Sequence, residues 1–433
     1  MERLKRRVDT RGAARYNYSS PMTSAGAPRP FTEGINIGVL TRIFHRDLID
    51  DVLHYTHRTG QRTRLLPGRV TVYFVLALCL FCDEAYEEVM RKLVDGLKFL
   101  GNWSGNWRVP TSSAMTQARD RLGEEPLAEL FDRVAVPMAR PATIGAWFHG
   151  LRVMAVDGVL FDVPDTPDNA AAFAKASSSA GPGPFPQVRL VGLAESGTHA
   201  IVAAVFDTRT VDERALFTQL IDDFEPGMIV LCDRGFYSYQ LWQQAAATGA
   251  QLLWRLKSDL KIPVLQVLPD GSYLSELVPR IVKNNYRRGR IRNIPDHLRI
   301  PVRVLEYAIT NRDGETETIT VMTTILDHEL APAGELAALY QQRWEFELTL
   351  DEIEVHQMPH SRLLRSRTSK LVRQEIWGLL LTHYAVRAFM REAADDVGED
   401  VDRLSFIRTI RVIRRQVGNQ AGFSPSPPEG SDP

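Results

Sequence analysis

The sequence predicts an α/β fold, in which helices flank a mixed β-sheet, and a domain made only of helices comes first. Two observations carry this prediction. From residue 35 to about residue 100, apolar residues recur at the spacing of helices. From residue 151, three strand-like segments follow one another, and strands then alternate with amphipathic helices, which is the pattern of an α/β domain with a mixed sheet.

The composition is typical of a globular protein that works away from membranes. The chain has 433 residues, of which 44% are hydrophobic and 24% charged. Its longest apolar run, 70–81, is far shorter than the roughly 20 residues that span a bilayer. The three cysteines give no disulfide framework, and the N-terminus lacks the apolar core of a secretory signal, so we expect a cytoplasmic protein. Cys79 and Cys82 lie in an apolar helix without a second cysteine pair, which favours buried core thiols over a zinc site.

The helical domain is expected at 33–145, after a disordered basic arm at 1–32. Its helical segments lie at 37–56, 69–81, 85–100 and 109–135. The last segment begins with Ser and Thr, which cap helices, and Gly123 divides it into two helices.

The α/β domain is expected at 146–393, followed by a C-terminal helix and a disordered tail at 394–433. Its strands are predicted at 151–165, 185–196, 199–208, 227–236 and 250–257, and its helices at 213–224, 238–249, 339–354 and 369–394. Short strands and a basic segment fill an insertion at about 257–330. Trp254 and Trp344 are predicted to lie in the core, as most tryptophans do.

The predicted helix at 339–354 carries an unusual polar stripe. Its members are Tyr340, Arg343, Glu347, Asp351 and Glu354. Because these positions step by three and four, their side chains share one helical face. For Glu347 alone, a surface ion pair with Arg343 is the simpler interpretation. The alternative is that Glu347 belongs to a site whose other members lie far away in the chain.

Asp157 and Asp233 are the other carboxylates of that predicted site. Each lies at an apolar strand, where a carboxylate is costly unless it is paired, hydrogen-bonded or bound to a metal. Each taken singly could be a turn or cap residue. Together with Glu347, and without a cluster of His or Cys, they form the oxygen-ligand set that Mg²⁺ or Mn²⁺ prefers. A pair of such ions is suited to in-line phosphoryl transfer.

Local basic segments indicate contact with nucleic acid, although the formal net charge is only −1. The segment 280–303 has Asp296 as its only acid, and the segments 362–373 and 403–415 have none. A solvated loop is the alternative interpretation of 280–303. Tyr286 lies within this segment and could stack on a base, although a surface tyrosine is the simpler interpretation. The side chains that we expect to contact the DNA backbone are Lys283, Arg287, Arg288, Arg290, Arg292, Arg365, Arg367 and Lys370.

These residues resemble the DDE transposases of the bacterial insertion sequence 4 family. The resemblance lies in the segments 156–158 (VDG), 232–238 (CDRGFYS) and 340–347 (YQQRWEFE), and it extends over about 34–418. The spacing of Tyr340, Arg343 and Glu347 matches the family's pattern of Tyr, two residues, Arg, three residues and Glu. The resemblance implies a ribonuclease H-like catalytic domain after a helical DNA-binding domain. It also implies that Asp157, Asp233 and Glu347 are a catalytic triad holding two Mg²⁺ or Mn²⁺ ions, with Tyr340 and Arg343 as accessory residues.

The implied function is metal-dependent cleavage of DNA at the terminal inverted repeats of an insertion sequence and transfer of the cut end to target DNA. A cut-and-paste route, a homodimeric synaptic complex and a place at the bacterial nucleoid belong to the same expectation.

One position departs from the family, because Glu354 stands where the pattern has Lys. An acid there would repel the DNA backbone. Either Lys370 or an arginine of 362–373 takes the role of that Lys, or this copy is weakened. Two alternatives therefore stay open: a descendant that binds DNA without transposing it, and a metal-dependent phosphohydrolase of small molecules.

Overall fold

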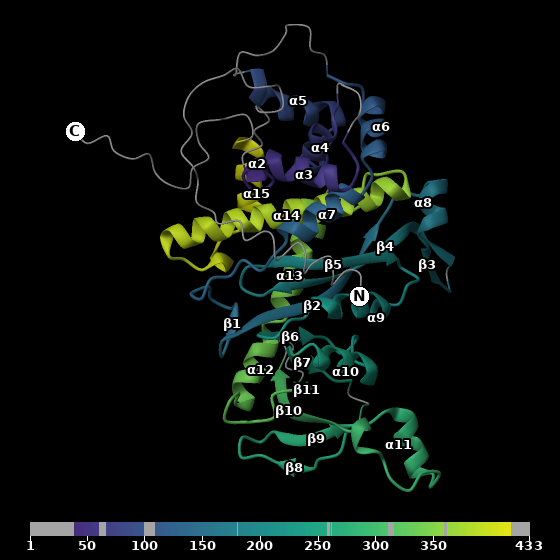
Figure 1. The fold of residues 1–433 in the computed structure, drawn as a ribbon, viewed down its shortest axis with the longest axis vertical. Coiled ribbons are helices and arrows are strands. Elements are labelled where there is room, and N and C mark those ends of the chain that lie inside the picture. Colours follow the sequence, from purple (N-terminus) through teal and green to yellow (C-terminus); the bar gives the residue numbers. More distant parts are fainter. Residues whose placement is uncertain are drawn as a thin grey trace, which may run out of the picture. The chain divides into compact units, whose positions relative to one another are not determined.

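The structure is a computed structural model that describes residues 39–59, 66–98, 109–179, 181–257, 260, 262–310, 316–358 and 362–416. The expected basic arm at 1–32 and the expected tail beyond residue 416 lie outside the described residues. Contacts divide the chain into two compact units. We call 1–138, 160–188 and 350–433 the helical unit, and 139–159 and 189–349 the sheet unit. The helices after residue 350 therefore cluster with the N-terminal helices (Figure 1).

The helical unit is organised around two buried helices from opposite ends of the chain. Its helices are α2 (Val39–Ile43), α3 (Arg46–Tyr55), α4 (Gly68–Leu80), α5 (Tyr86–Lys98), α6 (Ser112–Leu122), α7 (Glu125–Val134), α8 (Pro167–Ala172), α14 (Ser369–Val397) and α15 (Phe406–Gln416). The helix α4 is apolar on all sides and is buried almost throughout, as such a helix must be. It packs against α14. No helix among the described residues is long and apolar enough to cross a membrane.

The predicted helix boundaries are confirmed in one case and wrong in another. Thr111 caps α6 by accepting a hydrogen bond from the Ala114 N–H, and Gly123 ends the helix with a φ of 77°. The single helix expected at 37–56 is instead divided into α2 and α3. The division falls at His45, whose Nδ1 accepts a hydrogen bond from the Leu48 N–H and so starts a new helix.

The strands form one mixed sheet. They are β1 (Trp147–Phe148), β2 (Leu151–Asp162), β3 (Lys175–Ser178), β4 (Gly181–Glu195), β5 (Ala200–Thr208), β6 (Met228–Cys232), β7 (Gln251–Arg255), β8 (Gln266–Val267), β9 (Tyr273–Leu277), β10 (Ile300–Thr310) and β11 (Thr316–Thr323). The order is β3-β4-β2-β6-β7-β11-β10-β9-β8, with β5 beside β4 and β1 beside β2. The strands β2, β6 and β7 are parallel, and β7 to β11 continue antiparallel. The predicted α/β fold, a mixed sheet flanked by helices with a helical N-terminal region, is confirmed.

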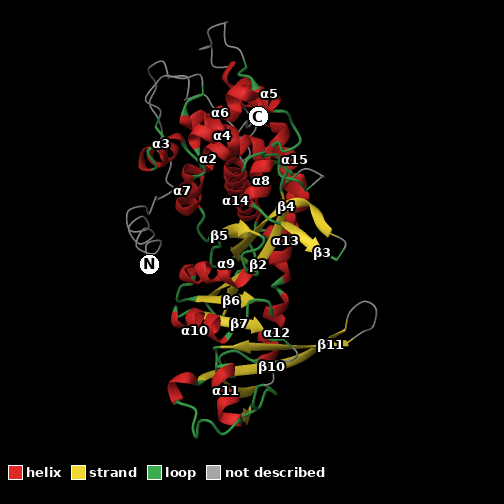
Figure 2. Cartoon of the chain, turned by 90° about the vertical axis from the view of Figure 1, so that its right-hand side faces the viewer, coloured by secondary structure: helices red, strands yellow, loops and turns green. Residues whose placement is uncertain are grey.

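The parallel strands form the centre of the sheet unit. Every residue of β6 is buried, as expected for a parallel strand covered on both faces. The helices α9 (Glu213–Leu220), α10 (Tyr239–Ala247), α12 (Ala333–Gln341) and α13 (Trp344–Asp351) accompany the strands. In both views α10 lies on one side of β6 and β7, and α12 lies on the other (Figures 1 and 2). Trp254 of β7 is fully buried against Trp242 of α10, with ring centroids 5.2 Å apart, which confirms its predicted core position.

The inserted segment extends this sheet. The strands β8 to β11 continue it beyond β7, and α11 (Arg280–Arg287) connects β9 to β10. The insertion is anchored by Arg303, which is fully buried. Its guanidinium donates to Ser272 Oγ at 2.8 Å and to the Ala331 carbonyl at 2.7 Å, and it pairs with Asp270. A charged side chain can be buried there because each part of it finds an acceptor.

Candidate active site

Asp157 and Asp233 directly follow the last paired residues of the parallel strands β2 and β6, Asp157 within β2 and Asp233 just after β6. The ladder between β2 and β6 ends with the pair Val156 and Cys232. The next residue on each strand is an aspartate, so the register alone makes Asp157 and Asp233 neighbours. The register thus brings together two of the three carboxylates of the predicted site.

Arg343 connects the first of these aspartates to Glu347. Its Nη1 donates to Asp157 Oδ2 at 3.1 Å, and its Nη2 donates to Glu347 Oε1 at 2.7 Å. The Arg343 side chain is only 8% exposed. The ion pair with Glu347 is present, but its guanidinium is buried and has a second partner from a distant part of the chain.

Tyr340 supports the strand that carries Asp233. Its side chain is buried, and its hydroxyl donates to the Cys232 carbonyl at 3.2 Å. Burial raises the pKa of this hydroxyl well above its ordinary value, so it stays protonated and able to donate. Tyr340 thus ties α12 to the last residue of β6, directly before Asp233.

The predicted single helix at 339–354 is wrong, because it is interrupted between α12 and α13. The backbone N–H groups of Gln342, Arg343, Glu345 and Phe346 bond to carbonyls three residues earlier, for example Arg343 N to Tyr340 O at 3.2 Å. These tighter bonds end the α-helical register at Gln342 and Arg343. The polar stripe is therefore not continuous. A π-helix, Glu352–Gln357, follows α13 and contains Glu354, which belongs to the helical unit.

The site is partly buried and electrostatically strained. Burial raises the pKa of Asp157 to about 6, an effect opposed by the Gly158 N–H and by Arg343. The charges of Glu347 and Asp233 raise it further. Asp233 Oδ1 is buried and has no hydrogen-bond partner among the described residues. Among the described residues, the carboxylate oxygens of Asp157, Asp233 and Glu347 do not all lie within 4.8 Å of one another.

These carboxylates fit a divalent metal. All the donors are oxygens, and one of them is a buried acceptor that no group among the described residues satisfies. The side chains of Asp157 and Glu347 are 21% and 37% exposed, so the site is open to solvent.

Glu213 is a nearby acid that the sequence did not single out. A Cβ at Gly158 would lie 2.5 Å from Glu213 Oε1 and 3.2 Å from the Leu190 carbonyl, so a larger residue there would displace the Glu213 carboxylate. Burial raises the pKa of Glu213, and the charge of Asp233 adds to this effect. Glu213 lies in the first turn of α9, where an acid ordinarily stabilises the helix dipole. Its position in the sequence therefore did not indicate a role in the site.

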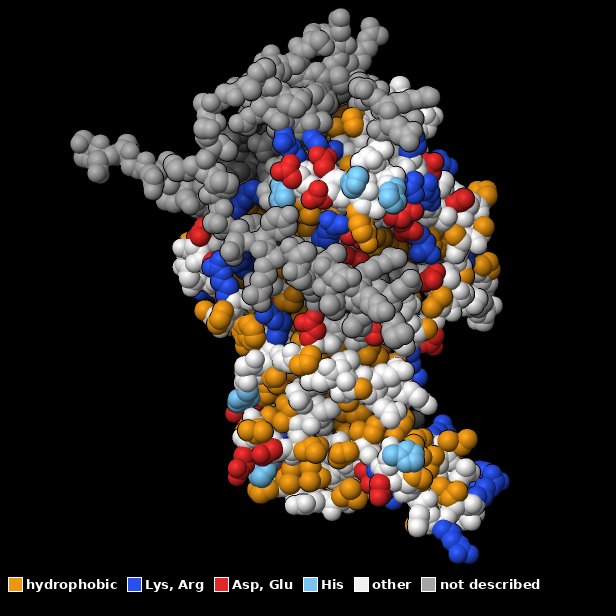
Figure 3. Space-filling model, in the orientation of Figure 1, with side chains coloured by type: hydrophobic (Ala, Val, Ile, Leu, Met, Phe, Trp, Pro, Cys, Tyr) orange, Lys and Arg blue, Asp and Glu red, His pale blue; other side chains and the backbone are white. Residues whose placement is uncertain are grey.

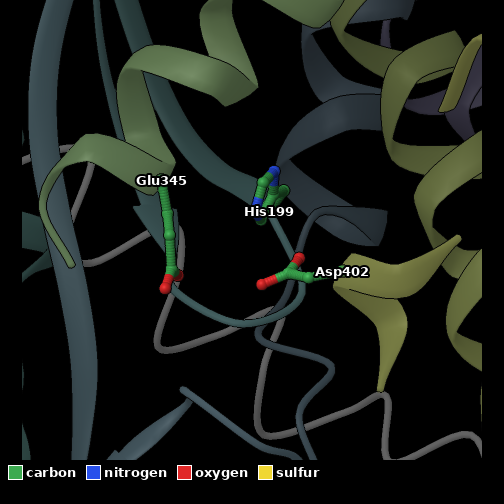
Figure 4. Close-up of side chains that lie close together, drawn as sticks. All are labelled: His199, Glu345 and Asp402. Carbon is green, nitrogen blue, oxygen red and sulfur yellow. The ribbon is translucent and has the colours of Figure 1, made fainter. Parts of the chain in front are cut away.

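Glu345, at the start of α13, and His199 belong to a turn and not to the triad. The Glu345 carboxylate accepts a hydrogen bond from the Gly197 N–H at 3.0 Å, in the turn between β4 and β5. His199 follows in the same turn with a φ of 57° (Figure 4). Asp402, also drawn there, belongs to the helical unit and is not part of this turn.

The basic side chains of the insertion are mostly exposed. Lys and Arg side chains gather over α11 (Figure 3). Arg287, Arg288, Arg290 and Arg292 are exposed, and Lys283 is half-buried. No ion pair within the described residues involves these four arginines. Tyr286 is 49% exposed among them.

The basic residues predicted after position 360 differ in their surroundings. Arg365 is half-buried and donates to the Glu84 carbonyl at 2.8 Å, with its guanidinium 4.7 Å from the Tyr86 ring centre. Lys370 is exposed and donates to the Asp120 carbonyl at 2.5 Å. Arg367 is exposed.

Two further predictions have clear outcomes. Trp344 is 64% exposed, so its predicted core position is wrong. It is the first residue of α13, and Phe346, two residues later, is buried in its place. The prediction of buried core thiols is confirmed for Cys79, whereas Cys82 is a free thiol that is only half-buried.

Comparisons with known proteins match nearly the whole chain. The family model described as insertion element 4 transposase N-terminal matches residues 34–132, and the model described as transposase DDE domain matches residues 148–384. The transposase InsG for insertion sequence element IS4 of Escherichia coli K12 is 31% identical over 385 residues, which cover 88% of this chain and 82% of that protein. A putative transposase InsZ of the same organism is 28% identical over 279 residues, or 64% of this chain and 86% of that protein. The piggyBac transposase, solved as a synaptic complex with hairpin DNA, aligns with a TM-score of 0.45 and 12% identity over 89% of this chain and 81% of that one.

Proposed function

Because this chain belongs to the insertion element 4 family of DDE transposases, we propose that Asp157, Asp233 and Glu347 are the carboxylates with which it cleaves and joins DNA. The family resemblance predicted from the motifs is confirmed. The chain is an enzyme of DNA transposition that catalyses phosphoryl transfer on DNA. Its partner is DNA, and its domain type depends on a divalent metal. A phosphohydrolase of small molecules is no longer a supported alternative.

The observation that carries the triad assignment is the position of Arg343. It joins Asp157 on β2 to Glu347 on α13, and Asp233 lies beside Asp157. The three acids would hold Mg²⁺ or Mn²⁺, and two such ions would supply an activated attacking oxygen and a stabilised leaving oxygen. Arg343 keeps Asp157 and Glu347 together, and Tyr340 fixes the backbone before Asp233. Arg343 also brings positive charge to the place where a scissile phosphate would lie.

The reaction begins with hydrolysis at the end of the element. A water oxygen forms a bond to phosphorus as the bond to the strand's 3′-oxygen breaks, and this leaves a 3′-hydroxyl. That hydroxyl then attacks a target phosphodiester and displaces the target's 3′-oxygen, so that each step exchanges one P–O bond for another. In the cut-and-paste route that we propose, the second strand at each end is also cleaved, so that the element leaves the donor DNA before the transfer step.

The other parts of the chain supply binding. In our proposal the helical domain at 33–145 binds the terminal inverted repeats, and 146–393 forms the catalytic domain, with the insertion at about 257–330. Lys283, Arg287, Arg288, Arg290 and Arg292 of the insertion contact the DNA backbone, as do Arg365, Arg367 and Lys370. Two copies pair the element ends in a synaptic homodimer at the nucleoid of a bacterial cell.

Glu354 bears on the remaining alternative, a descendant that binds DNA without cutting it. Its carboxylate lies 3.8 Å from the guanidinium of Arg362. Burial raises the pKa of Glu354, and Arg362 opposes that shift. The pairing reduces the negative charge that Glu354 would present to a phosphate, which favours an active enzyme.

The test is strand nicking of DNA that carries the element's own ends, with Mg²⁺ or Mn²⁺. We expect metal-dependent nicking by the wild type and none by Glu347→Gln, with equal binding of the DNA by both proteins. Glu345→Gln is the matched control, because this carboxylate is two residues away on the same helix but bonds to Gly197 instead. If neither wild type nor control cuts, and Glu354→Lys restores cutting, the chain is the DNA-binding descendant.

A further inference from the structure

The helix α15 is fixed to the helical unit through one face. Phe406, Ile410 and Ile413 are buried, and their spacing of four and three places them on one side. The side chain of Arg414 also turns inward, where its Nε donates to the Leu80 carbonyl at 2.6 Å and its Nη2 to the Gln357 carbonyl at 3.3 Å. These contacts hold the helix in one orientation and so determine which residues lie on its outer face.

The outer face of α15 is a row of arginines. Arg408, Arg411 and Arg415 are exposed and step by three and four, and Val412 lies among them at 39% exposure. None of these three arginines has an ion-pair partner in the described part of the chain. The Arg415 Nε donates only to the Arg411 carbonyl, one turn earlier. We call Arg408, Arg411 and Arg415 the α15 arginine row.

The arginines just before α15 are different. Arg391 pairs with Asp395 at 2.5 Å, and Arg403 pairs with Glu399 at 2.8 Å, each four residues away. From residue 404 to residue 416 the sequence has no acid. Like charges three and four residues apart repel each other, and nothing on the helix offsets that repulsion. A row of this kind destabilises the isolated helix, but it is a suitable surface for binding an anion.

We propose that the α15 arginine row binds the phosphate backbone of duplex DNA. Its length suits this partner. Seven residues of α-helix advance about 10 Å, which is the axial rise of about three base pairs. Three cations on a rigid helix can therefore each meet a phosphate without a conformational change. Since the contacts are to phosphates, the row positions the duplex and does not read its sequence. The proposal adds a DNA contact in the helical unit and does not depend on the triad assignment.

The test measures how DNA binding by the full chain depends on salt, by fluorescence anisotropy in EDTA between about 50 and 200 mM KCl. Each phosphate contact adds about 0.9 to the slope of log K against log salt, so Arg408→Gln/Arg411→Gln/Arg415→Gln is expected to lower the slope by about 2.7. The same three positions changed to Lys keep the charge and should keep the slope. The matched control replaces three exposed arginines that have acidic partners, Arg46, Arg91 and Arg403, with Gln.

The measurement uses two duplexes of equal length, one with the element end and one of unrelated sequence. Loss of slope on both duplexes means that the row holds any DNA, and loss on the element end alone means that it holds the element. An unchanged slope on both would overturn the proposal, as would an equal loss in the paired-arginine control or in the Lys variant. If the triple variant does not fold, each single Gln variant should lower the slope by about 0.9. The binding measurement is made in EDTA, without metal. Failure of the metal-dependent nicking assay would therefore not affect its outcome.

Discussion

Two arginine–carboxylate clusters lie on consecutive helical segments of the chain and differ in how completely they are satisfied. In the sheet unit Arg343 bonds to Asp157 and Glu347, whose side chains are 21% and 37% exposed. In the helical unit Arg387 and His383 surround Glu352, whose side chain is 10% exposed. The first cluster joins one arginine to two acids, whereas the second joins one acid to two basic residues.

The difference lies in the oxygens. Glu352 Oε2 lies 2.9 Å from His383 Nε2 and accepts from Arg387 Nε at 2.8 Å, and its Oε1 also bonds to Arg387. In the first cluster one arginine is shared between two acids, and the neighbouring Asp233 Oδ1 has no donor in the described structure. A buried acid whose oxygens are all bonded fixes the fold, whereas a partly exposed group with an unsatisfied oxygen retains the capacity to bind a ligand.

The largest expected effect is on catalysis at the open cluster. Asp233→Asn keeps the shape of the side chain and removes its charge, so nicking should fall by on the order of a thousandfold or more. Folding stability should not fall, because Oδ1 has no hydrogen bond to lose. Nicking assays, Mn²⁺ titration and urea unfolding of the same protein check both parts. Wild-type activity in this variant would remove Asp233 from the site.

The closed cluster should show the opposite response. Glu352→Gln leaves Arg387 buried without an anion, and breaking such a pair costs about 3 to 5 kcal/mol of unfolding free energy. Urea unfolding measures this loss. In the matched control, Glu399→Gln, an exposed pair with Arg403 is removed, and the loss should stay below about 1 kcal/mol. Equal losses of unfolding free energy in the two variants would mean that the buried ion pair stabilises this unit no more than the exposed one does.

The third effect concerns the glycine beside Asp157. Gly158→Ala places a methyl group 2.5 Å from Glu213 Oε1 and 3.2 Å from the Leu190 carbonyl, so one of them must move. We expect a loss of about 1 to 3 kcal/mol in unfolding free energy, together with weaker Mn²⁺ binding. In Gly158→Ala/Glu213→Ala the nearer obstacle is gone, and much of the stability should return. No recovery would mean that the carbonyl, not Glu213, is the constraint.

The smallest effect is on pH dependence. The pKa of Asp157 is raised by burial from 3.8 to about 6, so the folded state binds this proton more readily than the unfolded state. Its contribution to stability is therefore fully present below about pH 4 and is lost as the pH rises through about 6. The full shift corresponds to about 3 kcal/mol, and partial exposure reduces the expected effect to about 1 to 2 kcal/mol.

The measurement is the difference in unfolding free energy between wild type and Asp157→Asn, without metal, at pH 4 and pH 7. The wild type should lose stability relative to the variant between these values. Mn²⁺ at pH 7 should raise the urea midpoint of the wild type alone. A difference that does not change with pH would mean that Asp157 has an ordinary pKa.

Local patterns were sufficient to predict most of the elements. The apolar run that became α4, the cap and stop residues of α6 and the strands on both sides of Asp157 and Asp233 all follow from short-range chemistry. Where the prediction was wrong, a backbone hydrogen bond decided the outcome. The break at Gln342 and Arg343 depends on bonds three residues back, which leave no trace in the spacing of apolar residues.

The sequence by itself determined the types of residue that could do the chemistry and the strands and helices that carry them, because periodicity and motif spacing are properties of neighbouring positions. It could not determine that Arg343 is buried with two partners, that Asp233 keeps an unsatisfied oxygen, or that Glu213 occupies the space left by Gly158. Those facts depend on which segments distant in the chain meet, and on how much water they exclude. Only the tertiary structure decides both.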